Sequence, residues 1–141
     1  MDMKELFVKY MGDVTNVALA TSVDGKPNVR AVSIGFDEAT PGVIYFNTFA
    51  GSNKAAELKS NPSVTFIPFP DKSDTSVTIR VSGTASPAEI PVERIAELIG
   101  RHLPQYGEEI PKMGEHGALF QVKYEQAEIS LGMNPPEIIT F

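Results

Sequence analysis

Short segments in which apolar and polar residues alternate dominate this chain, and they predict an antiparallel β-protein. Six segments have this character, at residues 14–23, 28–36, 43–46, 64–69, 76–86 and 118–131. The second segment alternates two sets of side chains that face opposite sides, Val29, Ala31 and Ser33 against Arg30, Val32 and Ile34. Asp24-Gly25 separates the first two segments and predicts a tight hairpin, because both central positions of such a turn need a positive φ.

Three other segments show helical spacing or helix-end signals. Residues 2–11 carry apolar side chains at helical intervals and are followed by Gly12, which can end a helix. Residues 51–60 predict a short helix with Ser52 as its N-cap, ended by Asn61-Pro62. Pro91 opens a third helix that is predicted to reach residue 106, with residues 107–114 as a loop.

The resulting order, α-β-β-β-α-β-β-α-β, predicts a mainly β fold of the α+β type. Six strands joined mostly by hairpins form an antiparallel barrel with flanking helices. Strands and helices do not alternate regularly, so the order argues against a parallel dinucleotide-binding fold. No linker, repeat or low-complexity segment interrupts the chain, and residues 1–141 are expected to be one domain.

Composition excludes several kinds of site. The 141 residues include no cysteine, which removes disulfides, thiolate zinc sites, iron–sulfur clusters and cysteine nucleophiles together. This fits the reducing cytoplasm, where we expect the protein to be. The charged N-terminus lacks the apolar core of a signal peptide, and no apolar run approaches the ~20 residues that span a bilayer. The net charge of −6 disfavours nucleic acid and anionic membranes as partners.

Charge is distributed unevenly along the chain. Residues 26–80 contain six basic and five acidic side chains, a net charge of +1. Residues 81–141 contain four basic and nine acidic side chains, a net charge of −5. An anion-binding site is therefore expected in the first half, although a solvated acidic helix in the second half would produce the same imbalance.

Common catalytic and metal-binding motifs are missing from the sequence. It contains no GxxxxGK[ST], GxGxxG, GxSxG or HExxH pattern. His102 and His116 lack the spacing of metal ligands, and Glu108-Glu109 is best interpreted as a solvated pair. We predict no metal site, and the sequence identifies no catalytic residue.

Two features do indicate chemistry. Arg30 stands on an otherwise apolar predicted strand, and residues 48–54 (Thr-Phe-Ala-Gly-Ser-Asn-Lys) join a strand to the short helix. The free N–H groups and the positive end of the dipole at a helix N-terminus favour an anion. Lys54 and Arg30 would add a point charge and a planar guanidinium fork, so the pair fits a phosphate. The alternative is an ordinary capped strand-to-helix turn.

Several segments, in this order and spacing, resemble the FMN-binding split-barrel superfamily, whose named member is pyridoxamine 5′-phosphate oxidase. The similarity covers nearly the whole chain. It rests on residues 27–32 (Pro-Asn-Val-Arg-Ala-Val), 46–48 (Phe-Asn-Thr), 51–58 (Gly-Ser-Asn-Lys-Ala-Ala-Glu-Leu), 61–62 (Asn-Pro), 77–83 (Val-Thr-Ile-Arg-Val-Ser-Gly) and 120–128 (Phe-Gln-Val-Lys-Tyr-Glu-Gln-Ala-Glu). The resemblance implies a six-stranded split β-barrel with Greek-key character.

The resemblance also implies a homodimer with FMN bound between the two chains. Arg30 and Lys54 would hold the phosphate, with further donors from Thr48 and Ser52. The cofactor-binding set that we expect comprises Arg30, Ala31, Val32, Ser33, Asn47, Thr48, Ser52, Asn53, Lys54 and Thr78. In this set the backbone of residues 31–33 would follow the edge of the isoalloxazine ring, and Thr78 takes the place of a glutamine that reaches the flavin of the partner chain. The apolar side chains of Val32, Ile34, Phe69 and Ile79 are expected to need a partner as well.

Departures from the oxidases point away from vitamin B6 chemistry. Asn53, Gly35 and Ser130 stand where the oxidases carry a basic residue, a substrate-side lysine and a tryptophan. Residues 134–141 lack the Arg and His that bind pyridoxal phosphate in the oxidases, and we expect no counterpart of their N-terminal extension. The sequence therefore predicts an FMN-dependent oxidoreductase with a small-molecule redox substrate other than pyridoxamine phosphate.

Other functions remain open at this point. A non-catalytic flavin-binding protein or electron carrier would need the same phosphate site. A relative could bind deazaflavin or haem instead, although two histidines outside the predicted strands argue against haem. The barrel could also bind no cofactor. Tyr45, Tyr106 and Tyr124 could approach a flavin, but packing in the core or an interface is the simpler interpretation.

Overall fold

The computed structural model describes residues 2–69 and 76–141. Its helices are α1 (Met3–Gly12), α2 (Asn53–Ser60), α3 (Val92–Gly100), α4 (Pro104–Glu109) and the 3-10 helix η1 (Ile110–His116). Its strands are β1 (Asn16–Val23), β2 (Lys26–Ser33), β3 (Gly35–Phe36), β4 (Val43–Phe49), β5 (Ser63–Pro68), β6 (Val77–Pro87), β7 (Gly117–Lys123), β8 (Gln126–Leu131) and β9 (Glu137–Thr140).

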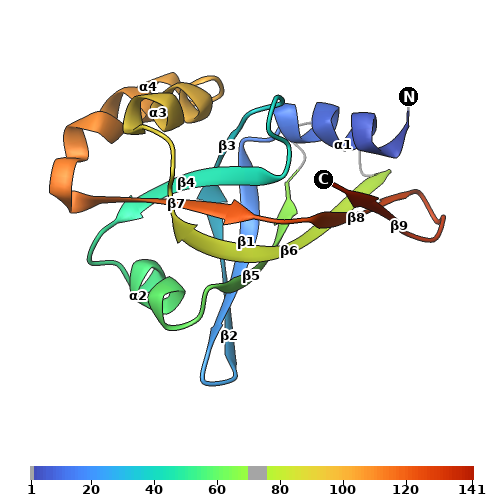
Figure 1. The fold of residues 1–141 in the computed structure, drawn as a ribbon, viewed down its shortest axis with the longest axis horizontal. Helices are drawn as coiled ribbons and strands as arrows, with labels where there is room; N and C mark the ends of the chain where they lie inside the picture. The colour runs from blue at the N-terminus through green and yellow to red at the C-terminus, as the bar shows by residue number, and fades with distance from the viewer. Residues whose placement is uncertain (1, 70–75) are drawn as a thin grey trace.

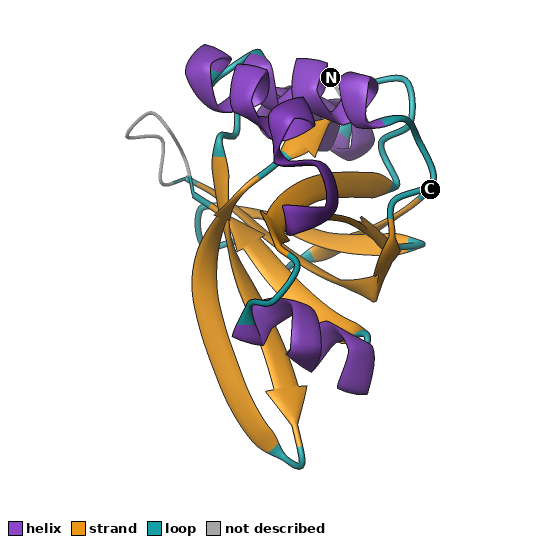
Figure 2. Cartoon of the chain, turned by 90° about the vertical axis from the view of Figure 1, so that its left-hand side faces the viewer, coloured by secondary structure: helices purple, strands orange, loops and turns teal. Residues whose placement is uncertain are grey.

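The strands form a mostly antiparallel sheet that curls into a half-barrel with helices at its flanks (Figure 1). The strand order is β2-β1-β5-β6-β7-β4-β3, and β8 pairs with both β6 and β9. Each pairing of strands in the described residues is antiparallel. Figure 2 shows α2 alone beside the long β1–β2 hairpin, with the other helices gathered at the opposite end of the sheet. The predicted mainly β, split-barrel class is confirmed.

The long strand β6 holds the sheet together because it pairs in turn with three strands. Its first part pairs with β8, its middle with β5 and its last part with β7. Gly83 lies at the crossing, where a Cβ atom would stand 2.5 Å from the carbonyl oxygen of Lys123. Glycine is therefore required for β6 and β7 to approach this closely.

The predicted count of six strands was too low. The predicted strand 28–36 is divided into β2 and β3 at Ile34, and the predicted strand 118–131 is divided into β7 and β8 at Tyr124 and Glu125. Tyr124 makes the second corner, because its N–H donates to the Gly42 carbonyl and its buried hydroxyl donates to the Pro41 carbonyl at 2.7 Å. The edge strand β9 was not predicted.

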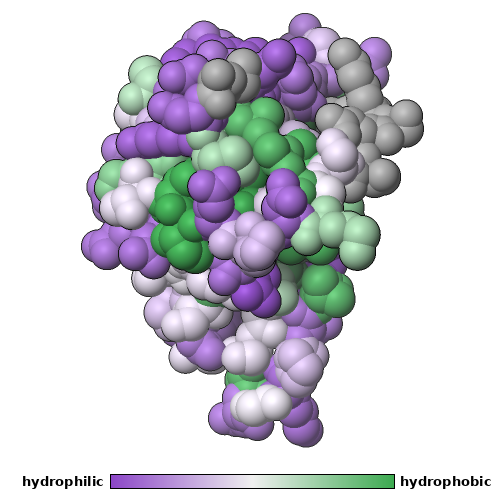
Figure 3. Space-filling model, turned by 90° about the vertical axis from the view of Figure 1, so that its right-hand side faces the viewer, coloured by the Kyte–Doolittle hydropathy of each residue, from purple (hydrophilic) through white to green (hydrophobic). Residues whose placement is uncertain are grey.

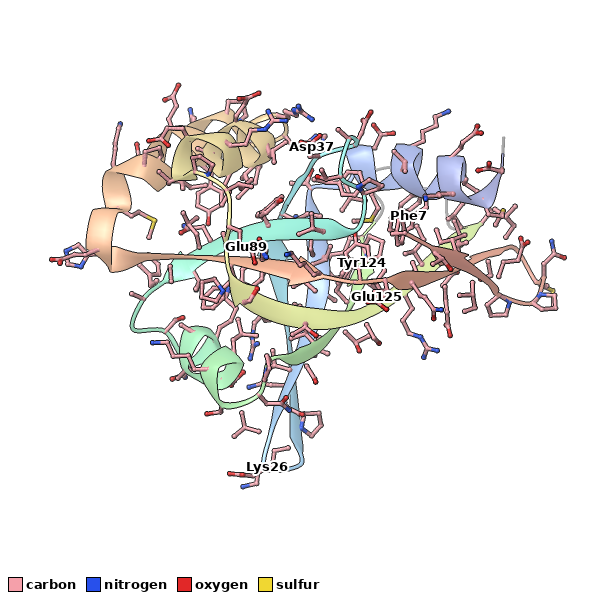
Figure 4. The ribbon with its side chains drawn as sticks, in the orientation of Figure 1. Phe7, Lys26, Asp37, Glu89, Tyr124 and Glu125 are labelled. Carbon is pink, nitrogen blue, oxygen red and sulfur yellow. The ribbon has the colours of Figure 1, made fainter. Side chains whose placement is uncertain are left out.

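The Asp24-Gly25 hairpin prediction is confirmed. Both residues have positive φ angles, 52° and 77°, and the register runs from Val23 opposite Lys26 to Asn16 opposite Ser33. The hairpin extends well beyond the barrel, with Lys26 at its tip (Figure 4).

The interior of the half-barrel is an apolar core closed at one end by α1. Phe7 of α1 packs edge-on against Tyr124, with ring centroids 6.3 Å apart, and Tyr124 packs against Phe66 at 5.6 Å (Figure 4). Val32, Ile34 and Ile79 are 5%, 2% and 3% exposed and belong to the core of a single chain. The expectation that these three need a partner subunit was wrong, since the curl of the sheet already covers them.

A second apolar cluster lies on the outside of the sheet, where α3 packs against β3 and β4. The single helix predicted over residues 91–106 is in fact two helices, because Pro104 has no N–H to continue α3 and instead begins α4. The predicted loop 107–114 is also wrong, since these residues complete α4 and enter η1.

Candidate functional site

The connection from β4 to α2 forms a polar corner. Ser52 caps the helix, since its Oγ accepts a hydrogen bond from the Ala55 N–H at 3.1 Å, and it lies 3.1 Å from the Thr48 hydroxyl. The N–H groups of Asn53 and Lys54 precede the first intrahelical bond and have no acceptor in the described part of the chain. The predicted N-cap is confirmed, and the corner presents two hydroxyls and two free N–H donors.

Lys54 places an ammonium group beside this corner. Its side chain is half-buried, and its Nζ lies 5.6 Å from the centre of the Phe46 ring. No carboxylate of residues 2–69 or 76–141 lies within ion-pair distance of this Nζ. Burial, followed by repulsion from Arg30, lowers the pKa of Lys54 from its ordinary value. A half-buried cation without a counter-ion is suited to bind an anion.

Arg30 lies on β2, opposite Leu19 of β1. Its guanidinium donates to the Thr21 hydroxyl at 3.0 Å and to the Glu57 carboxylate at 2.7 Å. The ion pair is only partly exposed, with 22% of the Arg30 side chain and 18% of the Glu57 side chain accessible. Arg30 is therefore close enough to lower the pKa of Lys54, but it already has an anionic partner within the chain.

Glu57 is a functional candidate that was not predicted. The carboxylate also accepts hydrogen bonds from Thr21 at 2.7 Å and from Asn28 at 2.9 Å. These bonds, with that of Thr21 the strongest influence, hold the pKa of Glu57 below its ordinary range. Glu57 follows Lys54 by three residues in α2, a spacing that puts both on one face of a helix. That spacing was the signal in the sequence that could have identified it.

Residues 31–33 lie on β2, which is an end strand of the sheet. The Ile34 N–H donates to the Thr15 carbonyl, on the β1 side. Because N–H groups point to alternate sides along a strand, those of Ala31 and Ser33 point to the unpaired edge. Val32 is buried in the barrel core, whereas the side chain of Ala31 is exposed on the outer face of the sheet.

Asn47 and Thr78 are not brought to this corner within one chain. Asn47 is buried on the opposite face of β4, where its amide lies 3.3 Å from the Tyr106 hydroxyl and 3.1 Å from the Met113 sulfur. Thr78 is exposed near the start of β6, opposite Ser130. The segment that follows α2 joins the sheet at the other part of β6, where Ser63 lies opposite Thr84. Of the predicted cofactor-binding residues, Arg30, Thr48, Ser52, Asn53 and Lys54 surround the corner.

Three further side chains lie apart from this corner. Arg80 on β6 is bound to Glu128 at 2.8 Å. Tyr45 and Tyr124 are 5% exposed, which places them in the core. In the described ranges, no three His, Cys, Asp or Glu side chains are grouped as metal ligands. No helix of the described residues has the length and apolar character to cross a membrane.

The sequence model of the family described as pyridoxamine 5′-phosphate oxidase-like matches residues 10–135. Because this match covers most of the chain, the protein belongs to the pyridoxamine 5′-phosphate oxidase-like family. A comparison with curated proteins gives no match.

Solved structures with the same fold carry varied names. The general stress protein 26 of Bacillus anthracis superposes with a TM-score of 0.76 at 17% identity, with each chain covered in full (100%). The conserved hypothetical protein Rv2991 of Mycobacterium tuberculosis has a TM-score of 0.73 at 21% identity, over 93% of this chain and 85% of the other. HutZ, the heme storage protein of Vibrio cholerae, has a TM-score of 0.73 at 17% identity, over 94% and 99%. At these identities the likeness establishes the fold alone.

Proposed function

We propose that this protein binds FMN through its terminal phosphate at the corner between β4 and α2 and acts as a flavin-dependent oxidoreductase. The observation that carries the proposal is the half-buried Lys54 ammonium, which has no carboxylate partner in the described residues and stands beside two free helix N–H groups. The local residues fit a phosphate because they supply a charge, two hydroxyls and the positive end of a helix dipole.

Each residue has a distinct part in this proposal. Lys54 supplies the positive charge, and the N–H groups of Asn53 and Lys54 donate to phosphate oxygens. Thr48 and Ser52 hold each other at 3.1 Å, so Thr48 can donate outward while Ser52 keeps the helix capped. The unpaired edge of β2 offers the N–H groups of Ala31 and Ser33 to the edge of the flavin ring. FMN, when bound, supplies the hydride and electron transfer itself.

The complete site is proposed to lie between two copies of the chain. Exposed apolar side chains support this, because Ile67, Phe69 and Ile138 are 44%, 40% and 55% exposed on the outer face of the sheet. Ala31, Ala18 and Ile67 are direct cross-strand neighbours on that face. Figure 3 shows hydrophobic side chains gathered in the middle of one side of the molecule and surrounded by hydrophilic ones. A patch of this kind on a small protein is typical of an interface.

Sedimentation of the FMN-loaded protein at micromolar concentration tests the dimer. We expect a single species of twice the chain mass of 15.3 kDa. A monomer under these conditions would contradict the shared site, including the role of Thr78 toward the partner's flavin.

The visible absorption spectrum of the freshly purified protein, before and after addition of FMN and desalting, tests the class of cofactor. We expect the two bands of oxidised flavin to remain with the protein. A Soret band instead would favour haem, for which HutZ provides the precedent in this fold. The His102 Nε2 lies 2.9 Å from the Gly12 carbonyl, so His116 is the histidine that we would expect to act as an axial ligand in that case.

Turnover separates an enzyme from an electron carrier. The FMN-loaded protein is mixed with NADH or NADPH in air, and oxidation of the nucleotide is followed. Sustained, saturable oxidation is expected of an oxidoreductase, whereas stoichiometric reduction that then stops would identify a carrier.

A further inference from the structure

Glu57 is bonded to Arg30, one of the two cations that the sequence predicts for the phosphate site. One oxygen of its carboxylate accepts from both Arg30, at 2.7 Å, and Thr21, at 2.7 Å. The other oxygen accepts from Asn28 at 2.9 Å. All of these partners lie on β1 and β2, so the carboxylate attaches α2 to the hairpin.

The charge of Glu57 opposes the binding of a phosphate. Arg30 and Lys54 contribute two positive charges to the corner, and Glu57 removes one of them. A phosphate monoester carries close to two negative charges at neutral pH. The carboxylate therefore repels the ligand and occupies donors of Arg30 that would otherwise be directed at the phosphate.

Resting on the proposed function, we infer that Glu57 is a specificity-determining residue: a built-in anionic competitor at Arg30 that limits the affinity of the site for a terminal phosphate dianion. Arg30 is then a shared cation, and Lys54 is the main contact for the ligand. With the Glu57 charge present, the preference of the site for FMN over flavins that lack a terminal phosphate dianion is smaller than Arg30 and Lys54 alone would produce.

Titration of the ligand-free protein with FMN and with riboflavin, followed by flavin fluorescence, tests the inference in the variant Glu57→Gln. The amide keeps the size of the side chain and can still accept a bond from Thr21 or Arg30, but it has no charge. FMN is expected to bind roughly tenfold more tightly than to wild type, the size of effect that one like charge produces in a partly exposed site. Riboflavin, which has no phosphate, is expected to bind unchanged.

Glu97→Gln is the matched control. It changes the net charge by the same amount and also removes a carboxylate from an arginine, since Glu97 pairs with Arg94 on α3 at 2.7 Å. It should leave the affinity for FMN unchanged. Circular dichroism of each variant checks folding, and Glu57→Asp provides a second test. Its shorter side chain draws the charge back from Arg30, so a smaller gain in FMN affinity is expected.

The outcomes separate this inference from the proposed function. If wild type binds FMN and Glu57→Gln binds it equally or more weakly, Glu57 instead positions Arg30, and the inference fails while the proposed function stands. If Glu57→Gln binds FMN and wild type does not, the Glu57 charge prevents binding altogether, and the inference is supported. If neither protein binds FMN, both proposals are overturned.

Discussion

Gly35 lies so close to α3 that a Cβ atom on it would stand 2.8 Å from the Cβ of Leu98 and 3.2 Å from a side-chain carbon of Ile99. Leu98 and Ile99 are each 1% exposed, so neither can move aside. This contact fixes the position of α3 on the sheet. A side chain larger than hydrogen at position 35 would therefore have to displace α3.

The first prediction concerns this contact. Gly35→Ala should destabilise the fold by about 1–3 kcal/mol, the cost of overpacking a core. Urea unfolding followed by circular dichroism measures the change. Gly51→Ala is the control, because a Cβ atom at Gly51 meets nothing within 4 Å and its φ is not in the left-handed region. An equal effect of the two substitutions would contradict the packing argument.

The second prediction is that the FMN-loaded protein does not oxidise pyridoxamine 5′-phosphate at an enzymatically useful rate. That substrate needs a phosphate-binding site of its own, separate from the one that binds the phosphate of FMN. Gly35 cannot be replaced by a lysine without displacing α3, and Arg80 is already bound to Glu128. Hydrogen peroxide production is the measurement, and saturable turnover with a micromolar KM would refute the prediction.

The third prediction concerns the stability of the ligand-free protein. Lys54→Met keeps an unbranched side chain, one heavy atom shorter, over the Phe46 ring but removes a half-buried charge that has no carboxylate partner in the described residues. The Tm should therefore rise by a few degrees, about 2–5 °C per kcal/mol for a chain of this length. Lys59→Met, at an exposed position of the same helix, is the control and should change the Tm by less. A fall in the Tm of Lys54→Met would contradict the prediction, because it would show that the Lys54 charge stabilises the folded protein.

A fourth prediction follows from the pKa of Lys54. Burial lowers this pKa below its ordinary value of 10.5, so in the window between the two values the unfolded chain binds more protons. The free energy of unfolding of the ligand-free protein should therefore rise with pH across that window as the penalty is lost. A bound phosphate favours the charged form and reverses the effect: FMN affinity should fall as the pH rises through the pKa of Lys54. Titrations between about pH 7 and 10 test this, and the pH dependence should be absent in Lys54→Met.

Local signals in the sequence predicted local structure well. A tight two-residue hairpin needs two positive φ angles, which Asp24 and Gly25 adopt, and the Ser52 hydroxyl can accept the hydrogen bond that an N-cap requires. The corner formed by Ser52, Asn53 and Lys54 was predictable for the same reason, because these residues are neighbours in sequence and Arg30 alone had to be brought from elsewhere.

The features that were missed depend on the curl of the sheet. Alternation in β2 correctly separated Val32 from Ala31, but it could not indicate that the sheet closes over Val32, Ile34 and Ile79 within one chain. Asn47 faces Tyr106, which is 59 residues away in the sequence, so its separation from Lys54 depends on where α4 packs. The pairing of Arg30 with Glu57 across 27 residues was likewise invisible to a search for cations alone.

Isothermal titration of FMN and riboflavin into wild type and Lys54→Met tests the central claim, that the corner beside Lys54 holds the terminal phosphate of FMN. Wild type should bind FMN at least tenfold more tightly than riboflavin. Lys54→Met should weaken FMN binding by about 1.5–3 kcal/mol, the range for a lost charge-assisted hydrogen bond, and leave riboflavin binding unchanged. Equal affinity of wild type for FMN and riboflavin, or an unaltered preference for FMN in Lys54→Met, would contradict the claim.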